Sequence, residues 1–204
     1  MGNELAKAVS AAVDNALTNR IREPRYRVFR NGLMDYEACI KAAKEWIPDS
    51  GRPDLALRSI FGDGAVLAIN GIAQWNHEVR DAISSILPDL NSKISNLNNK
   101  LIDSYTFISS SEGSTAFGAH IDFEDSVIVD LAGCGRVIRT WKPGADFGAI
   151  LPGAPTHFGT SMDWYMYSED SSVAILSPGD IGVIAANEPH IFHALGPGFF
   201  SVYQ

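Results

Sequence analysis

Two histidines and one aspartate in the second half of this 204-residue chain have the types and spacing of a metal site. His120 and Asp122 are two residues apart, and in a β-strand such residues point to the same face. His190 follows the turn 178–180 and the β-rich run 181–185, so a late strand would bring it as a third ligand. Two neutral imidazoles and one carboxylate leave the opposite side of an ion open, as in non-haem Fe(II) sites that handle O₂. The pattern therefore predicts a divalent metal site, with iron as the first choice.

The spacing alone leaves alternatives open. His-X-Asp triplets also occur by chance, and the same side chains could be hydrogen-bonded core histidines and a turn-capping aspartate. His193 competes with His190 as the third ligand, but residues three apart in a strand point to opposite faces, so His190 is preferred. His157 lies in the Gly/Pro-rich loop 151–160, either as an ordinary loop residue or as a side chain that covers the mouth of the site.

The elements that would position these residues are short strands. From Ile102 onward, β-rich runs alternate with clusters of Gly, Pro, Ser and Asp, which is typical of an all-β barrel or sandwich. The predicted strands are 102–109, 117–123, 126–131, 136–141, 162–167, 172–176, 181–185 and 199–203. In a jelly-roll topology, strands near opposite ends of such a domain can lie side by side, which would bring residues 120 and 190 together.

The first hundred residues have a helical texture instead. Apolar residues recur every four positions from Leu5 to Leu17, which predicts one buried stripe on a helix over 3–20. We expect this stripe to pack against the barrel or against a second subunit, which makes the helix a candidate dimer contact. Further predicted elements are helices at 36–47 and 76–88 and a buried strand at 65–69. We expect a single domain over 1–204, with a helical region (1–100, one or two strands) packed on a β-barrel core (101–204).

Composition excludes several classes of function. The formal net charge is −8 and no run of Lys or Arg occurs, which argues against a nucleic-acid partner because phosphate binding needs clustered cations. No apolar run approaches the ~20 residues that a membrane helix requires. Cys39 and Cys134 lie far apart and form no CxxC pair, as expected of free thiols in a reducing compartment. We therefore expect a cytoplasmic protein that does not engage a membrane.

Taken together, residues 60–204 resemble the JmjC-type cupin oxygenases, most closely their ribosomal-oxygenase branch. The matching residues are Ile69-Asn70-Gly71-Ile72, Trp75, Tyr105 to Ser109, Gly113-Ser114, Phe117-Gly118, His120-Ile121-Asp122, Asp125, Gly133, Trp141, Gly179-Asp180 and His190. The resemblance implies a double-stranded β-helix, also called a jelly roll or cupin barrel. It also implies Fe(II) held by His120, Asp122 and His190, 2-oxoglutarate as cosubstrate, and an O₂-dependent hydroxylation.

The chain departs from this family at the residue that binds 2-oxoglutarate. The family has Lys or Arg at the position of Gly135, so another cation must hold the distal carboxylate of the cosubstrate. Regular strand alternation favours Arg139, whereas a β-bulge at 133–135 would favour Arg136. Three further residues are expected near the cosubstrate: Tyr105, and Thr106 or Ser109. Asp130 stands where the family often has Gln, and it adds a carboxylate that could face a cationic substrate.

Two other functions compete with an oxygenase. Residues 162–195 also resemble small cupins of sugar-acid metabolism, which bind a metal without 2-oxoglutarate. That resemblance implies an isomerase, lyase or hydrolase acting on a sugar-like compound, with His193 or Glu188 as general base. A barrel without catalytic activity is the third hypothesis. For the oxygenase, the acidic charge and short length favour a small-molecule substrate, such as an amino-acid-like or cationic compound, over a ribosomal protein.

Overall fold

The structure is a computed structural model that describes residues 2–19, 26–30, 33–93, 104–113, 116, 118–122, 124–142 and 171–203. For Gly2, residues 86–93 and Ser104, only the backbone is described. The helices are α1 (Gly2–Thr18), α2 (Tyr36–Glu45), α3 (Pro53–Phe61), α4 (Ile72–Trp75) and α5 (His77–Lys93). None of the described helices is long and apolar enough to span a lipid bilayer.

The strands form two antiparallel sheets. Their bounds are β1 (Tyr26–Arg30), β2 (Leu33–Met34), β3 (Ala65–Asn70), β4 (Ser104–Ser109), β5 (Ser126–Gly133), β6 (Arg136–Trp141), β7 (Ser171–Leu176), β8 (Ile181–Ile184), β9 (His190–Ala194) and β10 (Gly198–Tyr203). The large sheet has the order β2-β1-β3-β4-β10-β5-β8, and the small sheet has the order β7-β6-β9. The expected cupin-type jelly roll is confirmed, because the inner faces of both sheets share one apolar core.

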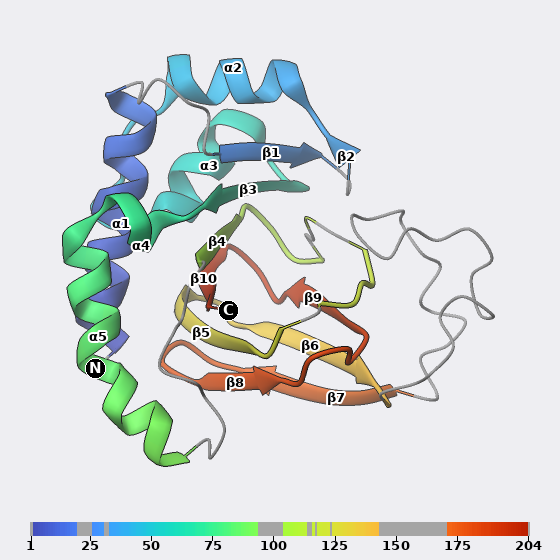
Figure 1. Cartoon of the computed structure of the whole chain (residues 1–204). Coiled ribbons are helices and arrows are strands. Elements are labelled where there is room, and N and C mark those ends of the chain that lie inside the picture. Colours follow the sequence, from blue (N-terminus) through green and yellow to red (C-terminus); the bar gives the residue numbers. More distant parts are fainter. Residues whose placement is uncertain are drawn as a thin grey trace.

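The large sheet has two different faces. Its inner face, with Phe107, Ile128 and Phe200, packs against Ile138 and Leu176 of the small sheet. Its outer face is covered by the helices, which Figure 1 shows gathered on the side of the strands away from β6 and β7. Helix α1 packs on β5 and α5, while α3 packs on β4 and β10. The functional residues must therefore lie on the inner face or at its rim.

The helices form where caps and apolar stripes predict them. The carboxylate of Asp35 accepts a hydrogen bond from the Ala38 backbone N–H at 2.9 Å, and the Asn76 side chain accepts one from Val79 at 3.0 Å. Both are ordinary N-caps for α2 and α5. The stripe of α1 from Leu5 to Leu17 is buried within its own chain. Of the two expected partners of this stripe, the structure shows the barrel, and the stripe is therefore not available to a second subunit.

Several boundaries differ from the sequence prediction. Helix α3 was not predicted, although Pro53 at its first turn and Asp54 beside it are typical starting residues. Helix α5 continues through Pro88 to Lys93, although a proline in a helix removes one backbone donor and crowds the preceding turn. Strand β9 was also missed. The predicted strand 162–167 and His157 lie outside the described residues.

Candidate metal centre

His120, Asp122 and His190 converge at one end of the barrel interior. His190 begins β9, and the backbones of His120 and His190 exchange two hydrogen bonds, of 3.0 and 2.9 Å, across an isolated antiparallel bridge. Within the described residues 118–122, the predicted strand 117–123 is reduced to this bridge, so strand alternation is not what aligns His120 with Asp122. One ligand atom from each of the three residues lies within 4.8 Å of the other two.

Both imidazoles are oriented by backbone carbonyls. The Nδ1 atom of His120 lies 2.9 Å from the carbonyl oxygen of Gly118, and the Nδ1 atom of His190 lies 2.9 Å from that of Glu188. A carbonyl oxygen only accepts, so each Nδ1 carries the proton and donates it. Each Nε2 is then left with a lone pair. Ligating histidines in metal proteins are commonly held in this way.

The two lone pairs face one carboxylate. The Nε2 atom of His190 lies 3.5 Å from Oδ2 of Asp122, and that of His120 lies 3.9 Å from Oδ1. These separations are too long for good hydrogen bonds. The His190 Nε2 atom is fully buried and has no hydrogen-bond partner among the described residues. A buried nitrogen in this state needs an explanation, and a divalent cation between the three side chains supplies one, so the residues fit a metal.

The carboxylate is kept in its ionised form. Burial would raise the pKa of Asp122, but the His190 contact and the attraction that the two imidazoles exert when protonated outweigh it and lower the pKa. The hydroxyl of Ser126, at the start of β5, contributes at 3.4 Å from Oδ2. Metal binding requires a deprotonated carboxylate and neutral imidazoles, and the site favours the first of these.

An arginine lies farther down the same interior. Thr140 of β6 pairs with His190, and Arg136 pairs with Ala194, four residues along β9. The side chain of Arg136 is only 1 % exposed. Its Nε donates to Oδ2 of Asp130 at 2.6 Å, and its guanidinium carbon lies 3.6 Å from the ring centroid of Phe200. Four strand residues correspond to about 13 Å of backbone rise, so the backbone of Arg136 lies farther along the barrel than that of Thr140.

Gly135 explains why the cation sits at 136. Gly135 adopts φ +81°, and a Cβ there would lie 2.4 Å from the carbonyl oxygen of Leu176. A lysine at 135 would therefore require the backbone to move. Strand β6 starts only at Arg136, so the alternation that favoured Arg139 does not extend back to 135. Arg139 bonds Ser171 at 2.8 Å and lies on the face of β6 opposite Thr140 and His190, so strand geometry now favours Arg136 over Arg139 as the cation of the interior.

The other expected cosubstrate residues divide between the two faces of β4. Tyr105 and Ser109 share the inner face with Phe107, to which the Tyr105 ring stacks at 6.2 Å. Thr106 is fully buried on the helix-facing side, where its hydroxyl lies 2.8 Å from that of Ser201. Thr106 is therefore outside the barrel interior, and that expectation is corrected. The alternation of β4 assigns only Tyr105 and Ser109 to the cavity side.

His193 and Glu188 are engaged elsewhere. His193 lies on the opposite face of β9 from His190, where burial and then the charge of Arg139 lower its pKa. The carboxylate of Glu188 accepts the Ala185 backbone N–H at 3.2 Å and so closes the turn before β9. Neither residue shares the inner face with the triad, which weakens both as general bases there.

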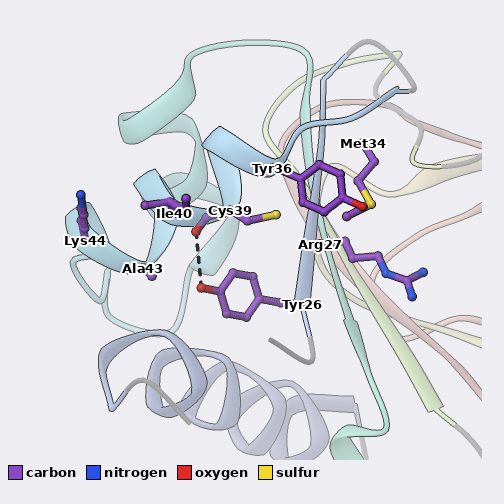
Figure 2. A pocket seen from close by; sticks show the side chains of 8 residues that line it. All are labelled: Tyr26, Arg27, Met34, Tyr36, Cys39, Ile40, Ala43 and Lys44. Atoms are coloured by element: carbon purple, nitrogen blue, oxygen red, sulfur yellow. Dashed lines mark hydrogen bonds between the residues drawn. The ribbon is translucent and has the colours of Figure 1, made fainter. Parts of the chain in front are cut away.

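A surface pocket lies in another part of the molecule. It is formed between β1, β2 and α2 and is lined by eight residues, including Tyr26, Met34, Cys39 and Ile40 (Figure 2). The Tyr26 hydroxyl donates to the Cys39 carbonyl across it at 3.4 Å. No residue of the triad lines this pocket, so it has no part in the metal chemistry. Both cysteines are free thiols, as expected.

Comparisons with known proteins add structural neighbours only. No protein-family model matches the sequence, and no curated protein matches it. Escherichia coli YcfD matches with a TM-score of 0.48 at 17% identity, over 69% of this chain and 33% of that one. The same ribosomal oxygenase in complex with cobalt and 2-oxoglutarate matches with a TM-score of 0.44 at 16% identity, over 70% of this chain and 32% of that one. The Ruegeria pomeroyi DMSP lyase DddQ matches with a TM-score of 0.30 at 14% identity, over 50% of this chain and 37% of that one.

YcfD is a ribosomal oxygenase and DddQ is a DMSP lyase. The chain spans about a third of the length of the YcfD chains it matches. Sequence reasoning did not find the pairing of Asp130 with Arg136 or the Ser126 contact. The Ser126 contact could have been predicted, because this hydroxyl lies four residues after Asp122, at the start of a strand.

Proposed function

We propose that this chain is an Fe(II)- and 2-oxoglutarate-dependent oxygenase, in which His120, Asp122 and His190 bind the metal. One observation carries the proposal. Two imidazoles whose Nδ1 protons are committed to backbone carbonyls direct their Nε2 atoms at one ionised carboxylate. This donor set favours a transition metal, and its three ligands leave room for further ligands. When bound, iron would supply O₂ activation coupled to decarboxylation of the 2-oxo acid and oxidation of a substrate C–H bond.

The chain's own residues would orient the cosubstrate. Arg136 is the buried cation on the inner face, and a guanidinium binds a carboxylate through two parallel hydrogen bonds. Tyr105 and Ser109 line the same face and would contact the cosubstrate between the metal and Arg136. Phe192 and Phe200, whose ring centroids are 5.3 Å apart, would exclude water from this interior.

We propose a small molecule as the substrate and O₂ as the oxidant, with no nucleic-acid or membrane partner. The net charge of −8 disfavours polyanions. Asp130 is paired with Arg136, so it does not supply a free negative charge for a cationic substrate, contrary to the earlier expectation.

The test is O₂ uptake by the Fe(II)-loaded protein, measured with an oxygen electrode with and without 2-oxoglutarate. Uptake should require both Fe(II) and 2-oxoglutarate, yield succinate, and disappear in His190→Ala. His193→Ala, on the other face of β9, is the matched control and should keep the activity. Arg136→Met should raise the 2-oxoglutarate concentration needed for half-maximal uptake, whereas Arg139→Ala should not.

A metal-dependent isomerase, lyase or hydrolase is the second candidate. It is favoured by the ion pair itself, because Asp130 neutralises the one cation available for the distal carboxylate of 2-oxoglutarate on the described inner face. This candidate predicts turnover of a sugar-like substrate without O₂. It also predicts that metal-loaded protein does not respond to 2-oxoglutarate.

A further inference from the structure

Asp130 has one carboxylate oxygen with a partner and one without. Its side chain is fully buried, and its Oδ2 accepts from Arg136. Its Oδ1 atom has no hydrogen-bond partner among the described residues. A buried charged acceptor without a donor is costly, so such atoms usually serve a ligand or an ordered water.

The guanidinium next to it is only partly used. Arg136 bonds Asp130 through Nε, and this is its one polar partner among the described residues. A planar guanidinium has two further amino groups that can donate. Arg136 and Asp130 therefore place a guanidinium and one unpaired acceptor side by side in the same interior.

The charge of this pair sets what it can bind. The ion pair is neutral overall, so a second carboxylate placed on Arg136 would also meet the Asp130 carboxylate at short range. Like charges in a buried site resist joint ionisation. A ligand group with an acceptor for Arg136 and a donor for Oδ1 meets no such repulsion. A primary amide and a protonated carboxyl group both have this character.

We infer that Asp130 is a specificity-determining residue whose Oδ1 atom requires a hydrogen-bond donor from the far end of the bound 2-oxo acid. The inference rests on the proposed function, because the triad and its metal would hold the 2-oxo acid end. The site then takes 2-oxo acids with a neutral, donor-bearing far end, such as an amide. It accepts 2-oxoglutarate only together with one proton. This proton resides on Asp130 Oδ1, which then donates a hydrogen bond to the ligand carboxylate.

The surroundings of Asp130 support proton uptake. Burial raises the pKa of Asp130, Arg136 opposes this, and the nearby carboxylate of Asp180 raises it further, with a net increase. Arg136 on β6 and Asp180 in the turn before β8 are the charged groups acting on it within the described chain. Strands β10 and β9 present Phe200 and Ala194 at this level.

The experiment uses the Co(II)-loaded protein and two unreactive ligands that chelate metal identically. N-oxalylglycine carries a carboxylate at its far end, and its primary amide carries a donor there. Isothermal titration calorimetry gives both affinities between pH 7 and 9. We expect the amide to bind at least about tenfold more tightly at pH 8 and to show little pH dependence, whereas N-oxalylglycine weakens by up to about tenfold per pH unit.

Asp130→Asn converts the open acceptor into a donor and removes the charge. It should reverse the preference, so that N-oxalylglycine binds more tightly than the amide and loses its pH dependence. If this variant does not fold, proton uptake measured with the wild-type protein, by titration in buffers of different ionisation enthalpy, replaces it. About one proton should be taken up with N-oxalylglycine and none with the amide.

The outcomes separate the two proposals. Tight, pH-independent binding of N-oxalylglycine by the wild type, with no preference for the amide, overturns the role of Asp130 and leaves the oxygenase intact. Binding of neither ligand, by metal-loaded wild type or variant, overturns both proposals. A water on Oδ1 in a purely structural ion pair would produce the first of these results.

Discussion

Strand β5 shows within eight residues how differently the two faces of the large sheet are used. Val127, Val129 and Leu131 point outward and are buried in the core that the helices share. Ser126 and Asp130, on the inward face, contact Asp122 and Arg136. Because successive side chains alternate, a slip of one residue would exchange the two sets. The comparison suggests that the outer face supplies stability and the inner face supplies chemistry.

The strongest test of this division is removal of a triad residue. Alanine at His120, Asp122 or His190 should weaken Co(II) binding by more than the ~10–100-fold that changes in the partners of metal ligands cost, while the apoprotein stays folded. Cobalt absorption and circular dichroism measure the two effects. His77→Ala, at an exposed helix start, is a control for loss of any histidine. Unfolding of the apoprotein variants would show that the inner face is structural.

The ion pair between Asp130 and Arg136 is an exception to this division, because it lies on the inner face and should also affect stability. Asp130→Ala leaves Arg136 buried without a counter-charge and should lower the free energy of unfolding by about 3–5 kcal/mol in a urea titration. Asp63→Ala removes an exposed ion pair with Arg58 and should cost under about 1 kcal/mol. Equal effects for both substitutions would mean that Arg136 finds another partner.

The outer face should respond in stability alone. Leu17→Ala removes a fully buried side chain of α1 from the helix core and should cost about 2–5 kcal/mol of unfolding free energy. Its Co(II) affinity, measured well below the unfolding transition, should equal that of the wild type. A drop in metal affinity would show that the helices position the triad rather than only support the sheet.

The smallest effect is expected at a helix cap. Asp35→Ala removes the bond to the Ala38 backbone and should cost about 1 kcal/mol. Asp35→Asn keeps an acceptor and should restore most of that loss. Both variants should bind metal normally, since α2 covers the edge of the sheet away from the triad. Thermal unfolding with matched heating rates would resolve the difference.

The barrel, its strands and the convergence of the three metal-site residues could be anticipated from the sequence. Alternation and turn residues located β6 at the same bounds as in the structure, and the wide spacing of His120 and His190 is typical of a jelly roll. The strand predicted around His120 did not form, yet the triad still assembled. Its geometry comes from the bridge to β9 and from backbone carbonyls, which carry no signal in the sequence.

The choice between Arg136 and Arg139 depended on one backbone angle. Strand alternation shows which arginine faces the interior only if the strand's first residue is known, and Gly135 with φ +81° lies outside the strand. The pairing of Asp130 with Arg136 was hidden for a similar reason. It joins two strands from different sheets, and no local pattern indicates which inward residues meet across a barrel.

The measurement that tests the central claim most directly is an anaerobic titration of the Fe(II) protein with 2-oxoglutarate, followed by visible absorption. The account predicts the weak charge-transfer band of a chelated 2-oxo acid, strengthening as the pH falls from 8 to 7. It also predicts that the band is absent in His120→Ala and present in His193→Ala. Iron binding without any band at either pH would contradict the oxygenase and direct attention to cupin chemistry that needs no cosubstrate.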